Sequence, residues 1–232
     1  MGRIVAISSG DLQSTQAINE YAVSLTNKPS PNVLFVGTAS EDNAGYIMNM
    51  GRVFGNLKCN VKALCLVTKT YTETEMNELL SWADIIYVGG GDTVFMMRKW
   101  KEVSLDKKLK DIYQKDSAVL MGISAGAICW FSCGHSDSEE VREEEFGFGW
   151  AEGMLDIHHF AFAPHYDEEG RDSFDVMLKQ KNIIGLGVET DAAFVEINGT
   201  ISYIKCSENA KVYKLEYVDG ELQKEELEVR RI

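Results

Sequence analysis

A serine with a glycine two positions to each side ends an apolar run near the middle of the chain, in the segment Gly122-Ile123-Ser124-Ala125-Gly126. This spacing between a strand and a helix is typical of a nucleophile elbow, a sharp turn that exposes the serine hydroxyl and leaves free backbone N–H groups behind it. The two glycines fit because the turn brings backbones too close together for a Cβ atom. We expect Ser124 to be a nucleophile, and the alternative is an ordinary strand-to-helix turn.

A serine is a weak nucleophile at neutral pH, so it needs a general base. The candidates are the four histidines of the chain: His135, His158, His159 and His165. His165 directly follows the apolar segment 160–164, at the carboxyl end of a predicted strand, where the sites of open α/β sheets gather. We predict His165 as the base, with His158 or His159 as the alternative.

An acid that orients the histidine is expected at the end of another strand. The segment 185–191 places Glu189 and Asp191 where a buried strand meets a loop. We predict Glu189 as this acid and Asp191 as the alternative. Either carboxylate could instead cap a neighbouring element, which would leave a serine–histidine dyad.

A glycine-rich turn, Gly89-Gly90-Gly91-Asp92, follows another short apolar strand. Its backbone N–H groups could approach a ligand closely, and a second oxyanion donor commonly comes from such a loop beside an elbow. A dinucleotide site fits less well, because Val94 occupies the position of the third glycine of that fingerprint.

The order of the elements must bring these segments to one edge of a sheet. Apolar strand-like runs alternate with amphipathic stretches up to about residue 190, which indicates βαβ units and a mostly parallel sheet. The predicted strands are 4–8, 33–38, 61–67, 85–88, 119–123, 160–164 and 184–188, and the predicted helices are 15–27, 43–57, 72–82, a helix from about 93, 104–115 and 171–181. Asn198-Gly199 and Asp219-Gly220 predict two C-terminal antiparallel hairpins that extend the main sheet. We expect residues 132–153, which include an acidic run from Glu139 to Glu145, to form a long loop, of which residues 136–153 could act as a lid.

Length and composition fit one soluble α/β domain over residues 1–232. The net charge of −13 disfavours nucleic acid and anionic membranes as partners. The five cysteines form no disulfide framework, and no leader segment or membrane span is apparent, so we expect a cytoplasmic protein. Cys129 and Cys133 lack the spacing of a zinc site, and we expect no metal or cofactor. A homodimer remains open.

Chain order narrows the class of enzyme. The α/β-hydrolases run serine, acid, histidine, whereas this chain runs Ser124, His165, then the acid. This order on a parallel sheet resembles class I glutamine amidotransferases with serine in place of cysteine. It is still more similar to the peptidase E family of serine dipeptidases and their relatives the cyanophycinases. The segments that carry this resemblance are 87–93 (Tyr-Val-Gly-Gly-Gly-Asp-Thr), 122–127 (Gly-Ile-Ser-Ala-Gly-Ala) and 163–166 (Ala-Pro-His-Tyr).

The resemblance implies a three-layer sandwich of the class I glutamine amidotransferase type. It also implies that Ser124 is the nucleophile, that His165 is the base, and that the oxyanion hole consists of N–H groups of Ala125 and of Gly90 or Gly91. The family's glutamate falls on Thr190 by strict register, between Glu189 and Asp191.

The same resemblance implies a small peptide substrate with an N-terminal aspartate. We assign Arg171 and Asp92 to substrate binding, since a guanidinium binds a carboxylate with two hydrogen bonds. The expected function is thus a serine dipeptidase that works through an acyl-enzyme. The alternatives are a cyanophycinase-like or other acyl hydrolase with the same site, and a non-catalytic binding module on the same fold.

Overall fold

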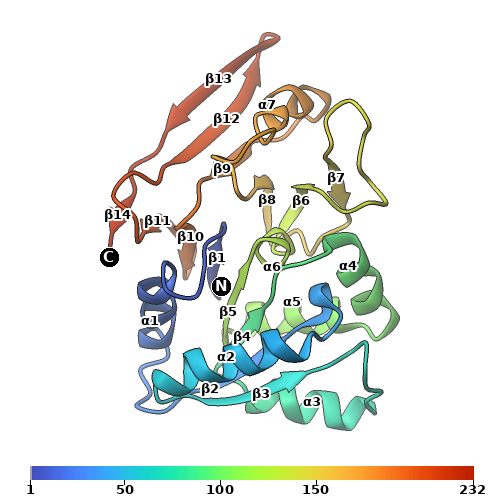
Figure 1. The fold of residues 1–232 in the computed structure, drawn as a ribbon, viewed down its shortest axis with the longest axis vertical. Helices are drawn as coiled ribbons and strands as arrows, with labels where there is room; N and C mark the ends of the chain where they lie inside the picture. The colour runs from blue at the N-terminus through green and yellow to red at the C-terminus, as the bar shows by residue number, and fades with distance from the viewer. Residues whose placement is uncertain (1) are drawn as a thin grey trace.

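A mostly parallel sheet lies at the centre of the structure, a computed structural model that describes residues 2–232 (Figure 1). Its eight strands follow one another in this order: β14 (Arg230–Arg231), β11 (Thr200–Lys205), β10 (Ala192–Ile197), β1 (Arg3–Ile7), β5 (Val119–Ile123), β4 (Ile85–Val88), β2 (Asn32–Val36) and β3 (Asn60–Leu64). The neighbours from β1 to β3 are all parallel. Each of these five strands overlaps a range that the apolar runs predict.

Helices cover both faces of this sheet, because successive strand residues point to opposite sides. Val5 of β1 belongs to a hydrophobic cluster with the buried residues of α1 (Gln16–Ser24) and α2 (Ala44–Asn56). Ile4, one residue earlier, belongs to a second cluster with the helices of the opposite face: α3 (Glu73–Trp82), α4 (Thr93–Glu102) and α5 (Leu105–Lys115). A capping box of Thr72 and Glu75 opens α3, the helix predicted at 72–82. The three-layer sandwich is therefore confirmed.

A second sheet lies beside the first and was not predicted. Its six strands follow this order: β13 (Glu221–Glu226), β12 (Val212–Val218), β9 (Gly185–Val188), β8 (His158–Ala163), β6 (Phe131–Ser136) and β7 (Gly149–Glu152). β6, β8 and β9 are parallel to one another, and the other pairs are antiparallel. The two sheets share a core, since Phe162 and Val188 belong to the same hydrophobic cluster as Leu120 of the larger sheet.

The prediction of one long loop at 132–153 is wrong, because both ends of this range are strands of the second sheet. The turn after Ser124 leads into α6 (Ala125–Ile128), which is only four residues long, and then into β6. β6 and β7 pair as an antiparallel hairpin, and only the acidic segment between them is irregular. The sequence does not indicate that these two short strands pair, because a charge run separates them.

Both C-terminal hairpins are present, at the predicted turns. Asn198 and Gly199 have φ of 52° and 87°, and Asp219 and Gly220 have φ of 52° and 85°, as tight two-residue hairpin turns require. The first hairpin joins the main sheet beside β1. The second, β12–β13, extends the second sheet instead and projects from the upper left of Figure 1.

Two shorter features complete the chain. The helix predicted at 171–181 is divided into α7 (Ser173–Met177) and the 3₁₀ turn η2 (Leu178–Gln180), and a second 3₁₀ turn, η1 (Thr38–Ser40), follows β2.

All five cysteines are free thiols. Among residues 2–232, no helix has the length and apolar character to cross a bilayer.

Candidate active site

Ser124 lies between β5 and α6 with φ 55° and ψ −116°. A positive φ is uncommon for a residue with a Cβ atom, and such strain persists only where the surrounding structure enforces it. Here the Ser124 N–H donates to the carbonyl oxygens of Ile7 and Ser8, at 3.1 and 3.0 Å. The structure thus contains the sharp turn that the glycine–serine spacing indicates.

The two flanking glycines allow this turn to pack against the sheet. A Cβ atom on Gly122 would lie 2.2 Å from the carbonyl oxygen of Gly126. One on Gly126 would lie 2.2 Å from the carbonyl oxygen of Val88, at the end of β4. Both distances are far below van der Waals contact, so only glycine fits at either position without moving the backbone.

His165 lies at the end of β8, after Pro164, and its imidazole faces the serine. Its Nε2 atom is 3.0 Å from the Ser124 Oγ atom, a hydrogen-bond distance. Its own φ is 57°, and its backbone N–H donates to the Ser8 Oγ atom at 2.7 Å. The structure therefore brings together the two residues that the sequence singled out first.

The other ring nitrogen of His165 contacts a residue that sequence reasoning missed. Its Nδ1 atom lies 2.6 Å from Oε1 of Glu168, three positions further along the chain. The Glu168 N–H donates back to the carbonyl oxygen of His165 at 2.8 Å, so one tight turn holds both groups. The His-x-x-Glu spacing is the sequence signal for this contact, whereas both predicted acids lie at the end of a strand.

Glu189 and Asp191 do not reach His165. The Glu189 carboxylate accepts the backbone N–H of Lys211 at 2.9 Å, and burial raises the pKa of this carboxyl. Asp191 lies beside Gly10 and donates its N–H to the carbonyl oxygen of Ser9. The expectation that one of them orients the histidine is therefore corrected: the chain folds back between β9 and β10, the Glu189 carboxylate bonds within that connection, and the buried Oδ1 atom of Asp191 has no hydrogen-bond partner among the described residues.

Thr190, which occupies the position of the family's glutamate, is also engaged elsewhere. Its N–H and hydroxyl both donate to Asp167, at 2.7 and 2.9 Å. The Ser9 hydroxyl donates to its Oγ1 atom at 2.9 Å. The two bonds to Asp167 fix the strand connection against the turn that carries His165, whereas the Ser9 hydroxyl contacts only Thr190.

The glycine-rich turn lies directly beside Ser124. A Cβ atom on Gly90 would be 3.3 Å from that of Ser124, and Gly91 has a φ of 138° that favours glycine. The Gly90 N–H points to the Tyr46 hydroxyl at 3.4 Å. Within residues 2–232, neither the Gly91 N–H nor the Ala125 N–H has a hydrogen-bond acceptor. Ala125 follows the serine in the chain, and Gly91 follows the glycine that packs against the serine, so both N–H groups are candidate donors.

Asp92 has a structural task at the end of this turn. It is the N-cap of α4, and its carboxylate accepts the backbone N–H of Phe95 at 2.9 Å. Such a cap satisfies one of the free N–H groups of the helix end. Substrate binding is therefore not needed to explain this aspartate.

Arg171 is a buried cation close to the candidate site. Its side chain is 6% exposed, its Nη1 donates to the carbonyl oxygen of His135 at 3.2 Å, and its guanidinium covers the Phe148 ring at 4.3 Å. Burial lowers the pKa of the guanidinium, while the nearby carboxylates of Asp137 and Glu168 raise it. Its Nη2 also forms an ion pair with Oδ2 of Asp137 at 3.8 Å. A guanidinium carries five N–H donors, so several of them have no hydrogen-bond acceptor among the described residues.

The remaining histidines lie outside the pair. His135 on β6 is fully buried and bonds Ser173. His158 on β8 bonds the buried carboxylate of Glu196, and His159 bonds Ser132 and Asp156 on an exposed surface. Neither alternative base reaches Ser124.

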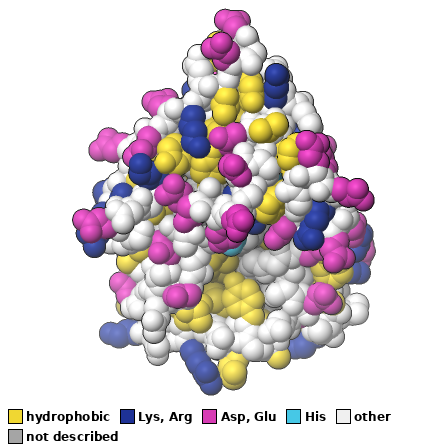
Figure 2. Space-filling view, turned by 45° about the horizontal axis from the view of Figure 1, so that its top comes forward, with side chains coloured by type: hydrophobic (Ala, Val, Ile, Leu, Met, Phe, Trp, Pro, Cys, Tyr) yellow, Lys and Arg dark blue, Asp and Glu magenta, His cyan; other side chains and the backbone are white. Residues whose placement is uncertain are grey.

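Three exposed acidic residues, Asp167, Glu168 and Glu169, come shortly after His165 in the chain. Figure 2 shows one face of the molecule, on which acidic side chains are spread widely and part of one histidine side chain is visible between them.

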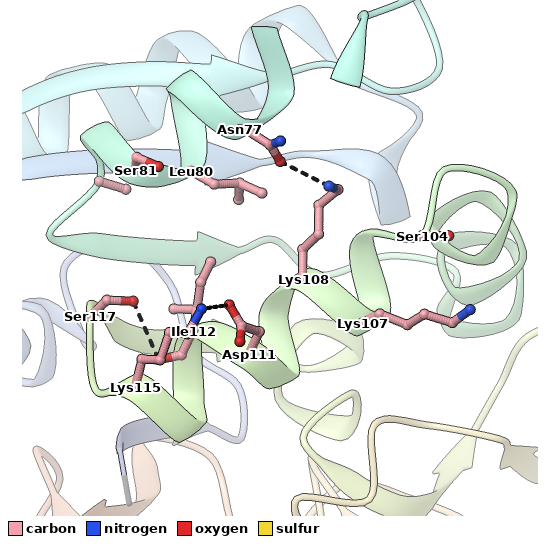
Figure 3. A pocket seen from close by; sticks show the side chains of 11 residues that line it. Asn77, Leu80, Ser81, Ser104, Lys107, Lys108, Asp111, Ile112, Lys115 and Ser117 are labelled. Atoms are coloured by element: carbon pink, nitrogen blue, oxygen red, sulfur yellow. Dashed lines mark hydrogen bonds and ion pairs between the residues drawn. The ribbon is translucent and has the colours of Figure 1, made fainter. Parts of the chain in front are cut away.

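A separate cavity of about 740 Å³ lies between α3 and α5 (Figure 3). Its lining includes Ser117, which precedes β5, whereas Ser124 follows β5, so this cavity lies toward the opposite end of the strand. Two of its lysines are already paired, Lys108 with Asn77 and Lys115 with Asp111.

A half-buried serine at a strained strand-to-helix turn, with a histidine nitrogen against its hydroxyl, is the arrangement of a serine hydrolase. Comparison with known proteins agrees. Residues 4–204 match Peptidase family S51. The chain is 29% identical, over 99% of both sequences, to a protein of Bacillus subtilis (strain 168) named "Uncharacterized peptidase YgaJ".

Two crystal structures share the fold. A peptidase from an acI-B1 Actinobacterium superposes with a TM-score of 0.73 at 18% identity, over 98% of this chain and 97% of that one. A "Putative Peptidase E Protein" from Listeria monocytogenes EGD-e superposes with a TM-score of 0.68 at 19% identity, over 89% of this chain and 100% of that one. The protein belongs to Peptidase family S51 and is a peptidase.

Proposed function

We propose that the protein is a serine-type dipeptidase that hydrolyses short peptides through an acyl-enzyme on Ser124. The observation that carries this proposal is the 3.0 Å contact between the Nε2 atom of His165 and the Ser124 Oγ atom. A base at hydrogen-bond distance from the hydroxyl it deprotonates is the geometric condition for a serine nucleophile.

In the first half of the reaction, His165 removes the proton from the Ser124 hydroxyl as the oxygen attacks the peptide carbonyl carbon. The tetrahedral intermediate collapses when the imidazolium gives this proton to the leaving amine. In the second half, a water molecule attacks the acyl-enzyme in the same way, with His165 first as base and then as acid, and Ser124 is restored. Glu168 holds the ring and stabilises its charged form through Nδ1.

The developing oxyanion would be bound by backbone donors. The N–H groups of Gly91 and Ala125 are the candidates, because neither has an acceptor among the described residues; Ala125 follows Ser124 in the chain, and Gly91 follows Gly90, which packs against Ser124. Gly90 is the weaker candidate because its N–H is directed at Tyr46. Each such donor is worth about 3 kcal/mol of transition-state stabilisation.

For the substrate, we propose a peptide with an N-terminal aspartate whose side chain pairs with Arg171. A buried guanidinium with unused donors is suited to a carboxylate, which it can bind with two charge-assisted hydrogen bonds. Five free thiols favour a reducing compartment such as the cytoplasm.

A serine-directed fluorophosphonate and a set of substrates test the proposal. We expect the wild-type protein to be labelled at Ser124 and to cleave an α-aspartyl dipeptide faster than a β-aspartyl dipeptide or a simple ester. Ser124→Ala should not be labelled, and its kcat should be lower than that of wild type by about 10⁴- to 10⁶-fold. Ser202→Ala, at an exposed serine on β11, is the matched control. Equal rates for Ser124→Ala and wild type would contradict the proposal.

A further inference from the structure

Ser8 touches the backbones of both residues of the candidate pair. It directly follows β1 and is fully buried. Its carbonyl oxygen accepts the N–H of Ser124 at 3.0 Å, and its Oγ atom accepts the N–H of His165 at 2.7 Å. Ser124 and His165 are 41 positions apart in the chain, so this residue is a direct bridge between two distant segments.

The Ser8 side chain is held in a single orientation. Its hydroxyl donates to the carbonyl oxygen of Val188, at the end of β9, at 2.6 Å. Its backbone N–H donates to the carbonyl oxygen of Ala192, which begins β10. The hydroxyl is therefore both donor and acceptor, and the residue joins the ends of strands from both sheets.

The bond to His165 matters because of the backbone conformation of that residue. A φ of 57° is an unfavourable region for a side chain with a Cβ atom, and it persists only when the surroundings enforce it. The Ser8 hydroxyl is the group that holds the His165 N–H in this conformation. The direction of the imidazole depends on that backbone, because a rotation at φ would swing the ring away from Ser124.

We propose that Ser8 is a positioning residue that fixes the position of His165 relative to Ser124. This inference rests on the proposed function, because it assumes that the two residues act together in catalysis. It predicts that the hydroxyl of Ser8 affects the chemical step rather than substrate binding, since Ser8 is buried beneath the site and has no surface for a substrate to contact.

The variant Ser8→Ala tests this role, and Ser9→Ala is its matched control. Ser9 is the next residue and is 4% exposed, but its hydroxyl bonds Thr190 rather than either member of the pair. We expect Ser8→Ala to lower kcat by about 10²-fold with little change in KM, because a displacement of about 1 Å at a reacting group has a cost of this order. Ser9→Ala should keep kcat within about threefold of wild type, and it should change the melting temperature by about as much as Ser8→Ala does.

A second variant separates the hydrogen bond from the volume. Ser8→Cys fills the same space, but a thiol is a weak donor and acceptor. We expect its kcat to fall as in Ser8→Ala, and its rate of fluorophosphonate labelling to fall in parallel. If Ser8→Ala does not fold, Ser8→Cys carries the test alone.

The outcomes are distinct for the two proposals. If wild type and Ser124→Ala are equally active, the proposed function fails. If activity depends on Ser124 while Ser8→Ala or Ser8→Cys keeps the wild-type kcat, the role of Ser8 is overturned. A rise in KM at unchanged kcat would also overturn it, because the hydroxyl would then act on binding.

Discussion

The carboxylate of Glu168 and the imidazole of His165 form a hydrogen bond of 2.6 Å within a single turn of chain. The carboxylate and the imidazole therefore come from one loop rather than from two strands. The Glu168 side chain is 52% exposed, whereas that of His165 is 21% exposed. The charge of this carboxylate is thus partly screened by solvent, so it stabilises an imidazolium less than a buried carboxylate would.

Replacing this carboxylate tests its role directly. Glu168→Gln keeps an oxygen acceptor near Nδ1 but removes the negative charge that stabilises the imidazolium. We expect kcat on an α-aspartyl dipeptide to fall by about 10²-fold, a smaller loss than at a buried triad acid. Steady-state kinetics of Glu168→Gln and Glu169→Gln provide the comparison, since Glu169 is adjacent and also exposed. Similar kcat values for the two variants would remove Glu168 from the mechanism.

The positions of the serine and the histidine could be predicted because each depends on local sequence. Two glycines around Ser124 specify a turn that no other residue type permits, and a strand before His165 specifies a sheet edge. The position of the acid could not be predicted in the same way. Several acidic residues follow strands or turns here, and their side-chain directions depend on φ at His165 and on the β9–β10 connection.

The fold, like the site, could be predicted from the sequence only in part. The central parallel sheet follows from long apolar runs that alternate with amphipathic helices. The second sheet does not, because β7 is a four-residue strand and β6 follows a helix of only four residues. Such short elements are stabilised by their partners rather than by their own sequence pattern.

Arg171 should determine substrate preference rather than the chemical step. We expect Arg171→Met to lower kcat/KM for an α-aspartyl dipeptide by about 10²-fold or more, and to change the value for an alanyl dipeptide much less, because only the former has a carboxylate to pair. Arg142→Met is the control, since Arg142 lies on the β6–β7 connection and bonds only the carbonyl oxygen of Asp137. The ratio of the two kcat/KM values is the measurement, and an unchanged ratio in Arg171→Met would exclude the pairing.

The glycine of the elbow helix should not accept a side chain. In Gly126→Ala, the added methyl group would overlap the carbonyl oxygen of Val88 and push α6 away from β4. We expect a loss of about 1–3 kcal/mol in the free energy of unfolding, as for other overpacked sites. Urea denaturation followed by circular dichroism measures this loss.

The control for that variant is Gly51→Ala. Gly51 lies inside α2, and a Cβ atom added there would meet no other part of the protein within 4 Å. Alanine favours helix more than glycine does, so this change should raise the free energy of unfolding by about 0.5–1 kcal/mol. A stabilised Gly126→Ala would show that the close approach of α6 to β4 is not as tight as described.

His135 should make the stability of the fold depend on pH. Burial, together with the nearby Arg171 cation, lowers the pKa of its imidazole to about 3, so the ring is neutral in the folded protein. In the unfolded chain its pKa is about 6.5. Below that value the unfolded state binds a proton that the folded state does not, so stability is lost as the pH falls from about 6.5 toward 3.

The measurement is the free energy of unfolding at several pH values between about 7.5 and 5, where few carboxylates titrate. One proton corresponds to a slope of about 1.4 kcal/mol per pH unit. We expect His135→Gln to reduce the slope below pH 6.5 by about this amount, since glutamine can still bond the Ser173 hydroxyl but does not titrate. His159→Gln, at an exposed histidine, should leave the slope close to that of wild type. Equal slopes for His135→Gln and wild type would mean that His135 takes up its proton while the protein is still folded.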